Sequence, residues 1–401
     1  MKKSVAIIGA NFGDETKGKH VDYFSDSDTI VVRTSGGSNA GHTVVKDNIK
    51  RIFKHFGSGT LSGASTYLSE YFISNPILFC RELDELKSIG IKPKIFVSPF
   101  GKLTFPVDMM INQIAEENRG DNRHGSCGVG INETMKRFET FHAFGTISNI
   151  FDIIQKYTFK EVVDCLHTHS KEWCNFRLKE LKITPSSEWN YALGNKNIVE
   201  DYVENCIKFF DNIEITRYID YDKKIVFEGS QGLLLDQNHY YFPHVTHSNT
   251  GLKNIIEISK KQGIDELDVI YLTRAYTTRH GAGPFPREDV NLSFDDETNL
   301  PNPFQGTLRF GYLDLDLLKE SIDNDLKHAD KISVRYGISI SCLDQLEKNG
   351  KYIFWKNNQK EISYSWYEFC KIICEHINAD KNLCFASFGP DSKNITKLWV
   401  D

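Results

Sequence analysis

Two glycine-rich stretches near the amino terminus carry the residues best suited to chemistry. The first, Gly13–Lys19, reads GDETKGK and fits the G-x-x-x-x-G-K pattern of a phosphate-binding loop. Its glycines let backbone N–H groups approach phosphate oxygens, and its lysines add positive charge. Position 20 is His, where an ordinary loop of this type has the Ser or Thr that holds Mg²⁺. Asp14 and Glu15 would repel phosphate unless a metal ion or a proton transfer uses them.

The second stretch, Gly36–Thr43, reads GGSNAGHT and presents a single imidazole, His42, among three glycines. A backbone of this kind can approach a ligand closely, and an imidazole can transfer a proton near neutral pH. A lone histidine in a loop is more often structural, and a lone phosphate-loop pattern is a weak signal. The two stretches together predict a nucleotide site with acid–base chemistry.

The residues around these loops predict the elements that hold them. Ser4–Ala10 predicts a β-strand that leads into the first loop, and Gly18–Phe24 predicts the helix that leaves it. Thr29–Arg33 (TIVVR) predicts the strand before the second stretch. This order of strand, loop and helix is typical of an α/β protein that opens on a buried parallel strand.

Strands and helices alternate through most of the remaining chain. Strands are predicted at Lys94–Val97, Ile225–Phe227, Asp268–Leu272, Ile332–Arg335 and Leu383–Ser387, helices at Pro76–Leu86, Leu313–His328 and Trp366–His376, and a long loop at Asp289–Gly306. Helical patterns at Ile150–Ile183 and Ile198–Tyr218 predict a helical insertion over residues 150–220. We expect one α/β domain over residues 1–401, with a mostly parallel central sheet flanked by helices.

Composition narrows the class of protein. The chain has 401 residues, of which 40% are hydrophobic and 25% charged, and this excludes extensive disorder. The formal net charge of −6 gives no basic excess for nucleic acid, and no stretch is long and apolar enough to span a membrane. Nine scattered cysteines without a CxxC pair argue against a disulfide framework. The opening run MKKSVAIIGA is too short for a signal peptide, so we expect a cytoplasmic protein.

Taken together, the motifs resemble those of the adenylosuccinate synthetase family. The matching stretches occur in the family's order and include the two loops, residues 227–236 (FEGSQGLLLD), 243–250 (PHVTHSNT), 279–286 (RHGAGPFP), 311–314 (GYLD) and 387–391 (SFGPD). The resemblance implies an α/β fold related to P-loop proteins and a homodimer. It also implies a ligase that joins L-aspartate to C6 of IMP with hydrolysis of a nucleoside triphosphate.

The resemblance also implies residue roles. Asp14, His42 and Gln231 match catalytic positions. Asp14 would take the N1 proton of a 6-oxopurine so that O6 attacks the γ-phosphate, and His42 would act as general acid on the transferring phosphoryl group. The 6-phosphoryl intermediate then loses phosphate as the amine of aspartate attacks C6. Mg²⁺ would be held by Asp14 and the carbonyl oxygen of Gly41.

Binding positions follow from the same match. Those implied for the nucleoside triphosphate are Gly13, Glu15, Thr16, Lys17, Gly18, Lys19, Gly41, Thr43, Arg335, Ser387 and Gly389. Those implied for the purine monophosphate are Asn39, Ala40, Ser126, Cys127, Arg137 and Thr246, with Arg137 as the arginine that crosses the dimer interface. Thr307 and Arg309 would bind aspartate. We interpret Arg274 as ordinary surface charge.

Three departures from the family pattern concern specificity. Members of the family usually bind the guanine of GTP with an Asp near the end of a late strand. The corresponding stretch here, Val334–Gly337, has no carboxylate to accept from guanine N1–H and its 2-amino group, so we expect that ATP or dATP can serve as donor. The arginine run before the family's Gly-Trp-Leu-Asp is reduced to Arg309, which could still pair with one carboxylate of aspartate. Cys127 replaces a threonine near the nucleotide phosphate, which weakens one hydrogen bond.

The alternatives concern the acceptor and the class of protein. Loss of the guanine reader also occurs in viral 2-aminoadenylosuccinate synthetases, which take dGMP, although those enzymes typically replace the catalytic Asp by Ser. Asp14 slightly favours IMP, and dGMP or GMP stays open. A non-catalytic nucleotide-binding regulator is the alternative of another class, and the intact Asp14 and His42 argue against it.

Overall fold

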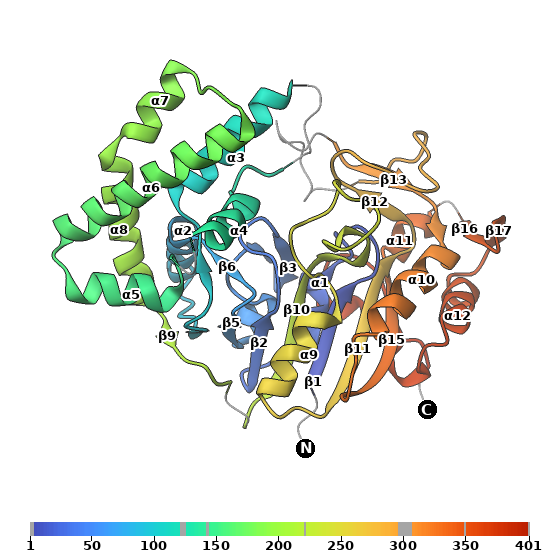
Figure 1. Ribbon diagram of the computed structural model, residues 1–401. Helices are drawn as coiled ribbons and strands as arrows, with labels where there is room; N and C mark the ends of the chain where they lie inside the picture. Colours follow the sequence, from blue (N-terminus) through green and yellow to red (C-terminus); the bar gives the residue numbers. More distant parts are fainter. Residues whose placement is uncertain are drawn as a thin grey trace.

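A ten-stranded sheet forms the centre of the molecule (Figure 1). The computed structural model describes residues 4–120, 126–141, 144–219, 222–295, 307–348 and 350–399. In spatial order the strands are β19 (Ile395–Lys397), β18 (Phe385–Ser387), β15 (Ser333–Ser341), β11 (Glu266–Arg274), β1 (Ser4–Gly9), β10 (Lys224–Gly232), β2 (Thr29–Arg33), β5 (Ser65–Leu68), β7 (Ile95–Val97) and β9 (Glu214–Ile215). Neighbouring strands are parallel except β18 and β19. The predicted α/β class with a mostly parallel sheet is confirmed.

The central strand shows why this sheet needs helices on both faces. All six residues of β1 are buried, and alternate side chains enter different apolar clusters. Ala6 and Ile8 join the larger cluster, whereas Val5 and Ile7 join the smaller one. A strand that is apolar on both faces is typical of parallel sheets that are covered on both sides.

Helices from four regions cover the two faces. Helix α9 (Leu252–Lys261), α10 (Leu315–Leu326) and α12 (Trp366–His376) contribute buried side chains to the larger cluster. Helix α1 (Lys17–Tyr23) contributes Val21 to the smaller cluster, on the opposite face. The predicted bounds Trp366–His376 and Thr29–Arg33 agree with the structure at both ends.

A helical lobe lies beside the β5–β7–β9 end of the sheet (Figure 1). It contains α2 (Pro76–Ser88), α3 (Pro106–Arg119), α4 (Ile131–Thr140), α5 (Ile147–Lys156), α6 (Phe159–Leu181), α7 (Ser187–Gly194) and α8 (Lys196–Phe210). Most of these helices contribute to a second large core, in which Phe79, Trp173 and Phe209 are fully buried. The helical prediction up to Tyr218 was wrong beyond Phe210, because β9 pairs there with β7. The division into one domain with an insertion at 150–220 stays a prediction.

Small sheets complete the architecture. They are formed by β3 (His42–Lys46) with β4 (Ile49–Phe53), β6 (Ile73–Ser74) with β8 (Lys102–Leu103), β12 (Thr277–Arg279) with β13 (Arg309–Gly311), and β14 (Leu313–Asp314) with β16 (Tyr352–Lys356) and β17 (Gln359–Ser363). The β3–β4 hairpin turns through Asp47 and Asn48, both with positive φ, which suits a two-residue turn. Part of the predicted loop at Asp289–Gly306 lies outside the described residues.

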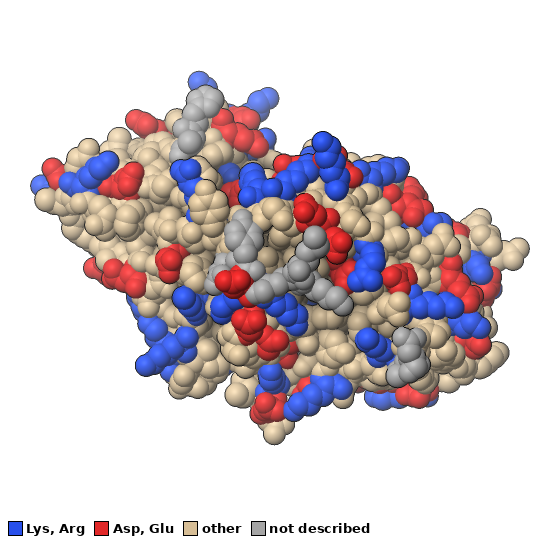
Figure 2. Space-filling model, turned by 90° about the horizontal axis from the view of Figure 1, so that it is seen from below, with Lys and Arg blue, Asp and Glu red and all other residues tan. Residues whose placement is uncertain are grey.

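The surface carries both signs of charge. Figure 2 shows Lys and Arg side chains interspersed with Asp and Glu over the face that it presents. In the described part of the chain, no helix combines the length and apolar character that crossing a bilayer requires.

Candidate active site

The strand register brings four chain segments to one edge of the sheet. Gly9 at the end of β1 lies beside Gly232 of β10 and Leu272 of β11, and Arg33 at the end of β2 lies beside Glu228. The segments that follow these strand ends therefore meet at one edge, where parallel α/β sheets bind ligands. They line a cleft of about 960 Å³ whose opposite wall includes residues of α3 and α4.

The first loop has the strained backbone of a ligand-binding turn. Gly13, Asp14 and Thr16 all have positive φ, at 95°, 59° and 62°. Residues other than glycine rarely adopt this conformation, and it concentrates at functional sites. Helix α1 begins directly after this turn, at Lys17, so its free N–H groups face the loop.

Glu15 stabilises the loop from the inside. Its carboxylate accepts hydrogen bonds from the N–H groups of Asn11 (3.1 Å) and Gly13 (2.8 Å), and Lys17 Nζ lies 3.1 Å from its other oxygen. Burial raises the pKa of Glu15, and Lys17 opposes that rise. The Glu15 side chain is thus used within the loop, and Glu15 is not among the residues that line the cleft.

Lys19 connects the first loop to the segment after β18. Its Nζ donates to the carbonyl oxygens of Phe388 (3.2 Å) and Gly389 (2.6 Å), and burial lowers its pKa to about 8. Gly389 lines the cleft together with Lys17 and Lys19. Buried ammonium groups next to a helix N-terminus are the electrostatic requirement for binding a polyphosphate.

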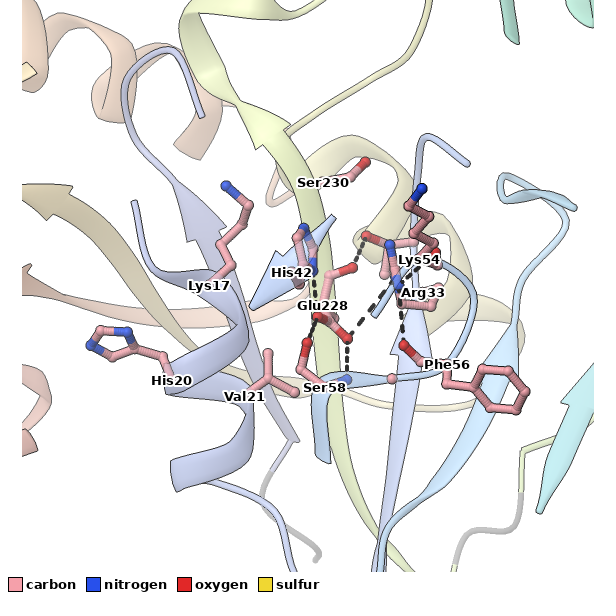
Figure 3. Close-up of polar contacts among 12 residues, drawn as sticks. Lys17, His20, Val21, Arg33, His42, Lys54, Phe56, Ser58, Glu228 and Ser230 are labelled. Atoms are coloured by element: carbon pink, nitrogen blue, oxygen red, sulfur yellow. Dashed lines mark hydrogen bonds and ion pairs between the residues drawn. The ribbon is translucent and has the colours of Figure 1, made fainter. Parts of the chain in front are cut away.

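His42, the first residue of β3, is held by a carboxylate. Its Nδ1 lies 2.5 Å from Oε1 of Glu228, which sits within β10 (Figure 3). Burial lowers the pKa of His42. Burial alone would raise the pKa of Glu228, but Arg33 and His42 lower it to about 2. An ionised Glu228 can only accept a hydrogen bond, so the proton of a neutral His42 lies on Nδ1. The other ring nitrogen, Nε2, has no hydrogen-bond partner among the described residues and is available to a ligand in the cleft.

Asp14 lines the same cleft as His42. Its carboxylate is partly exposed and lies 3.4 Å from Nε2 of His280, and its backbone carbonyl accepts from Nε of Arg274 at 2.6 Å. The structure therefore places the predicted carboxylate and imidazole around one cavity. A proton acceptor and a proton donor on the walls of a phosphate-binding cleft can activate an oxygen nucleophile for phosphoryl transfer.

Most of the residues predicted for the site line this cleft. They are Gly13, Asp14, Thr16, Lys17, Gly18, Lys19, Asn39, Ala40, Gly41, His42, Thr43, Ser126, Cys127, Gln231, Thr246 and Gly389. Ser387 is buried next to them, and its hydroxyl has no partner among the described residues. Five predicted residues do not line the cleft: Glu15, Arg137, Thr307, Arg309 and Arg335.

Arg335 is not at the site. It lies near the start of β15, opposite Asp268 of β11, with which it forms a two-point ion pair on the surface. The carboxyl end of β15 is Ser341, which pairs with Arg274. The predicted strand ended too early, so Arg335 was placed at the wrong edge of the sheet.

Arg137 cannot cross to a partner subunit from its position. It is 1% exposed, and its guanidinium forms a two-point ion pair with Asp108. It also donates to the carbonyl oxygens of Leu103 and Phe144 and stacks 3.8 Å above the Phe105 ring. The prediction for Arg137 was wrong because all its contacts lie within its own lobe.

Arg309 has its donors engaged within the chain. Its Nε and Nη2 pair with the carboxylate of Glu288 at 2.8 and 2.5 Å, and its Nη1 donates to the carbonyl oxygens of Gly281 and Gly283. The structure therefore does not present Arg309 as an open carboxylate receptor. Thr307 is exposed.

Several cleft residues were missed in the sequence. Arg274, interpreted as surface charge, is 7% exposed and contacts the first loop. Glu228 was part of a matched stretch but received no role. His280 and Lys136 line the cleft as well. The position of Arg274 at the end of a predicted strand was a signal that it lies at the binding edge.

The donor set fits a magnesium ion that is shared with phosphate. Asp14 and Gly41 both line the cleft, and Mg²⁺ prefers one or two carboxylates with substrate phosphates over an all-protein cage. Among the described residues, no group of three or more His, Cys, Asp or Glu side chains could hold a metal ion. A site completed by substrate oxygens agrees with both observations.

Comparisons with known proteins give a consistent result. The family model for adenylosuccinate synthetase matches residues 6–363. Adenylosuccinate synthetase from Borrelia duttonii is 31% identical over 97% of this chain and 88% of its own length. The enzyme from Mesoplasma florum is 30% identical, over 92% of this chain and 85% of its own.

Solved structures share the fold. The fully ligated adenylosuccinate synthetase from Plasmodium falciparum superimposes with a TM-score of 0.72 and 18% identity, and covers 98% of both chains. A succinoaminodeoxyadenylate synthetase (PurZ) from cyanophage S-2L, bound to dGMP and dATP, gives a TM-score of 0.59 and 12% identity, over 100% of this chain and 96% of its own. The chain therefore belongs to the adenylosuccinate synthetase family of carbon–nitrogen ligases.

Proposed function

We propose that this ligase joins L-aspartate to C6 of IMP and forms adenylosuccinate through a 6-phosphoryl intermediate. The observation that carries the proposal is that Asp14 and His42 line one cleft together with Lys17 and Lys19, while Glu228 holds the His42 ring. Asp14 accepts the N1 proton, and O6 attacks the γ-phosphorus while the bond from that phosphorus to the bridging oxygen breaks and the nucleoside diphosphate leaves. The His42 ring presents Nε2 to the transferring phosphoryl group, and Nε2 must first gain a proton before it can donate a hydrogen bond there.

The same cleft supplies charge for the triphosphate. Lys17, Lys19 and the N–H groups at the start of α1 neutralise phosphate oxygens, and Gln231 and Asn39 bind the purine nucleotide. Asp14 and the carbonyl oxygen of Gly41 would hold Mg²⁺, which neutralises developing negative charge on the phosphates when bound. The chemistry then ends with attack of the aspartate amine on C6 and departure of phosphate.

We also propose that the protein is a homodimer, which sedimentation analysis tests.

For the donor we propose ATP or dATP. The carboxyl end of β15 lies at the binding edge and carries Ser339 and Ser341, which offer hydroxyl groups and no carboxylate. The first carboxylate after the strand, Asp344, accepts the N–H of Gly389 at 2.9 Å. Guanine needs an acceptor for its N1–H and 2-amino groups, and adenine does not. The cyanophage relative, which was solved with dATP, supports the same choice.

A second candidate acceptor is dGMP. It is favoured by the fold shared with the dGMP-bound cyanophage enzyme. The intact Asp14 favours IMP. The two acceptors differ by the 2-amino group and the 2′-hydroxyl, so a direct comparison of turnover separates them.

The test is phosphate release with aspartate, with IMP or dGMP crossed with ATP, dATP and GTP. We expect turnover with IMP and ATP or dATP, and loss of turnover in Asp14→Ala and His42→Ala. A large preference for GTP would overturn the donor proposal. Binding without turnover in every combination would instead support the nucleotide-binding regulator.

A further inference from the structure

Arg33, the last residue of β2, is a buried cation that the chemistry above does not use. It is 0% exposed and lies beside Glu228 in the sheet register, with Nε 4.0 Å from Oε2 of that carboxylate (Figure 3). Its Nη1 donates to the carbonyl oxygens of Lys54 (3.1 Å) and Phe56 (3.4 Å), and its Cζ stands 5.0 Å above the Phe72 ring.

Burying Arg33 costs free energy that its packing contacts alone do not offset. Its Nε and Nη2 atoms are buried and have no hydrogen-bond partner among the described residues. A buried charge with unpaired N–H groups costs free energy that a well-packed apolar side chain would avoid. Packing therefore does not explain Arg33, whereas its place directly behind the Glu228–His42 pair does.

The segment of residues 54–56 gives Arg33 a second route to Glu228. Glu82 accepts the N–H groups of this segment at 2.9 to 3.4 Å, while Arg33 binds its carbonyl oxygens from the other side. The segment is thus held on both sides. Ser58 follows it, and donates both its N–H, at 3.0 Å, and its hydroxyl to Glu228.

We propose that Arg33 is a positioning residue for phosphoryl transfer. It holds the Glu228 carboxylate, directly by charge and indirectly through Ser58, so that the His42 ring is held by Glu228 with Nε2 on the side of the cleft. The role in turnover rests on the proposed function. A carboxylate that orients a catalytic imidazole is a known requirement for histidine catalysis. Here the carboxylate itself has a fixed cationic support.

Four variants test the proposal. Arg33→Met removes the charge, Arg33→Lys keeps it, and Ser58→Ala removes one donor to Glu228 with little risk to folding. Phe72→Leu alters the ring beneath Arg33 and serves as the packing control. Each is measured for kcat and KM with IMP, ATP and aspartate. Each is also measured without substrate by ¹⁵N NMR of histidine-labelled protein, with the His42 resonance assigned from His42→Ala.

We expect wild-type His42 to carry its proton on Nδ1. Arg33→Met should lower kcat roughly 10- to 100-fold, within the range of a misplaced acid–base group, with KM changed less than about threefold. It should also change the His42 Nδ1 signal, because the carboxylate that accepts this N–H is no longer held in place. Ser58→Ala should move both readouts less in the same direction, and Arg33→Lys should restore most of kcat.

Two results would overturn the proposal. One is an unchanged His42 Nδ1 signal in both Arg33→Met and Ser58→Ala. The other is an equal loss of kcat in Phe72→Leu, which would indicate a packing role. The NMR signal of His42 is read without substrate. If the wild-type protein shows no turnover, the proposed function is contradicted, but the NMR comparison of the variants still decides the role of Arg33.

Discussion

At the scale of single residues, the function depends on whether Asp14 acts as a base. Asp14→Asn keeps the size of the side chain and removes the proton acceptor, so we expect kcat to fall about 10²- to 10⁴-fold. Nucleotide affinity, measured by calorimetry, should change much less. Asp152→Asn, on the exposed side of α5, is the matched control and should retain wild-type turnover. An Asp14→Asn enzyme with near-normal kcat would contradict the assignment.

Single residues also show where sequence reasoning succeeds. The glycine pattern pointed to Asp14, Lys19 and His42, which the structure places on one cleft, because the pattern itself is a run of neighbours in the chain. Arg137 and Arg309 were misjudged because the partners that occupy them, Asp108 and Glu288, are 29 and 21 positions away. A local pattern contains no information about such partners.

At the scale of elements, Asp325 links α10 to α9 and makes the connection sensitive to pH. Its carboxylate is buried and accepts from Leu252 N–H and Tyr271 hydroxyl, both at 2.8 Å. Burial raises its pKa to about 7, from an ordinary value of 3.8. The folded state thus binds the extra proton between these values, and Asp325 contributes stability at low pH that is lost as the pH rises from about 4 to above 7.

Asp325→Asn should remove this dependence, because the amide stays neutral and can still accept from Leu252. Relative to wild type, the variant should therefore gain free energy of unfolding as the pH rises from 5 to 8. Urea denaturation at the two pH values measures this. Asp323→Asn, exposed on the same helix, is the control and should show no such gain. Equal pH profiles for wild type and Asp325→Asn would contradict the prediction.

Elements also set the limit of prediction from sequence. Strands such as Thr29–Arg33 were predicted with the correct bounds because they are short apolar runs between polar residues. Strand β15 was predicted to end at Arg335. The strand continues to Ser341, and Gly337 is required there because a Cβ would lie 2.1 Å from the carbonyl oxygen of Leu383. That single error moved a predicted binding residue to the wrong edge.

At the scale of the whole molecule, the cleft joins two separate cores. Its walls come from the sheet edge and from α3 and α4 of the helical lobe. A bound nucleotide pair should therefore stabilise both parts together. We expect IMP with a non-hydrolysable ATP analogue, each near 100 times its Kd, to raise the melting midpoint by a few degrees in one transition. Two separate unfolding transitions, one of them with a midpoint that the ligands do not change, would contradict this prediction.

The ion pair between Arg309 and Glu288 bears on the amino-acid substrate. A dicarboxylate that uses Arg309 does not enter an empty receptor, because it must first displace a carboxylate that the chain already supplies. Glu288 then behaves as a tethered competitor with a fixed effective concentration, and the apparent affinity for the amine is the intrinsic affinity multiplied by the fraction of Arg309 that is unoccupied. Saturation by the amine therefore depends on how strongly Glu288 holds Arg309, and salt acts on it in two opposing ways, because it weakens the internal pair and the incoming one alike.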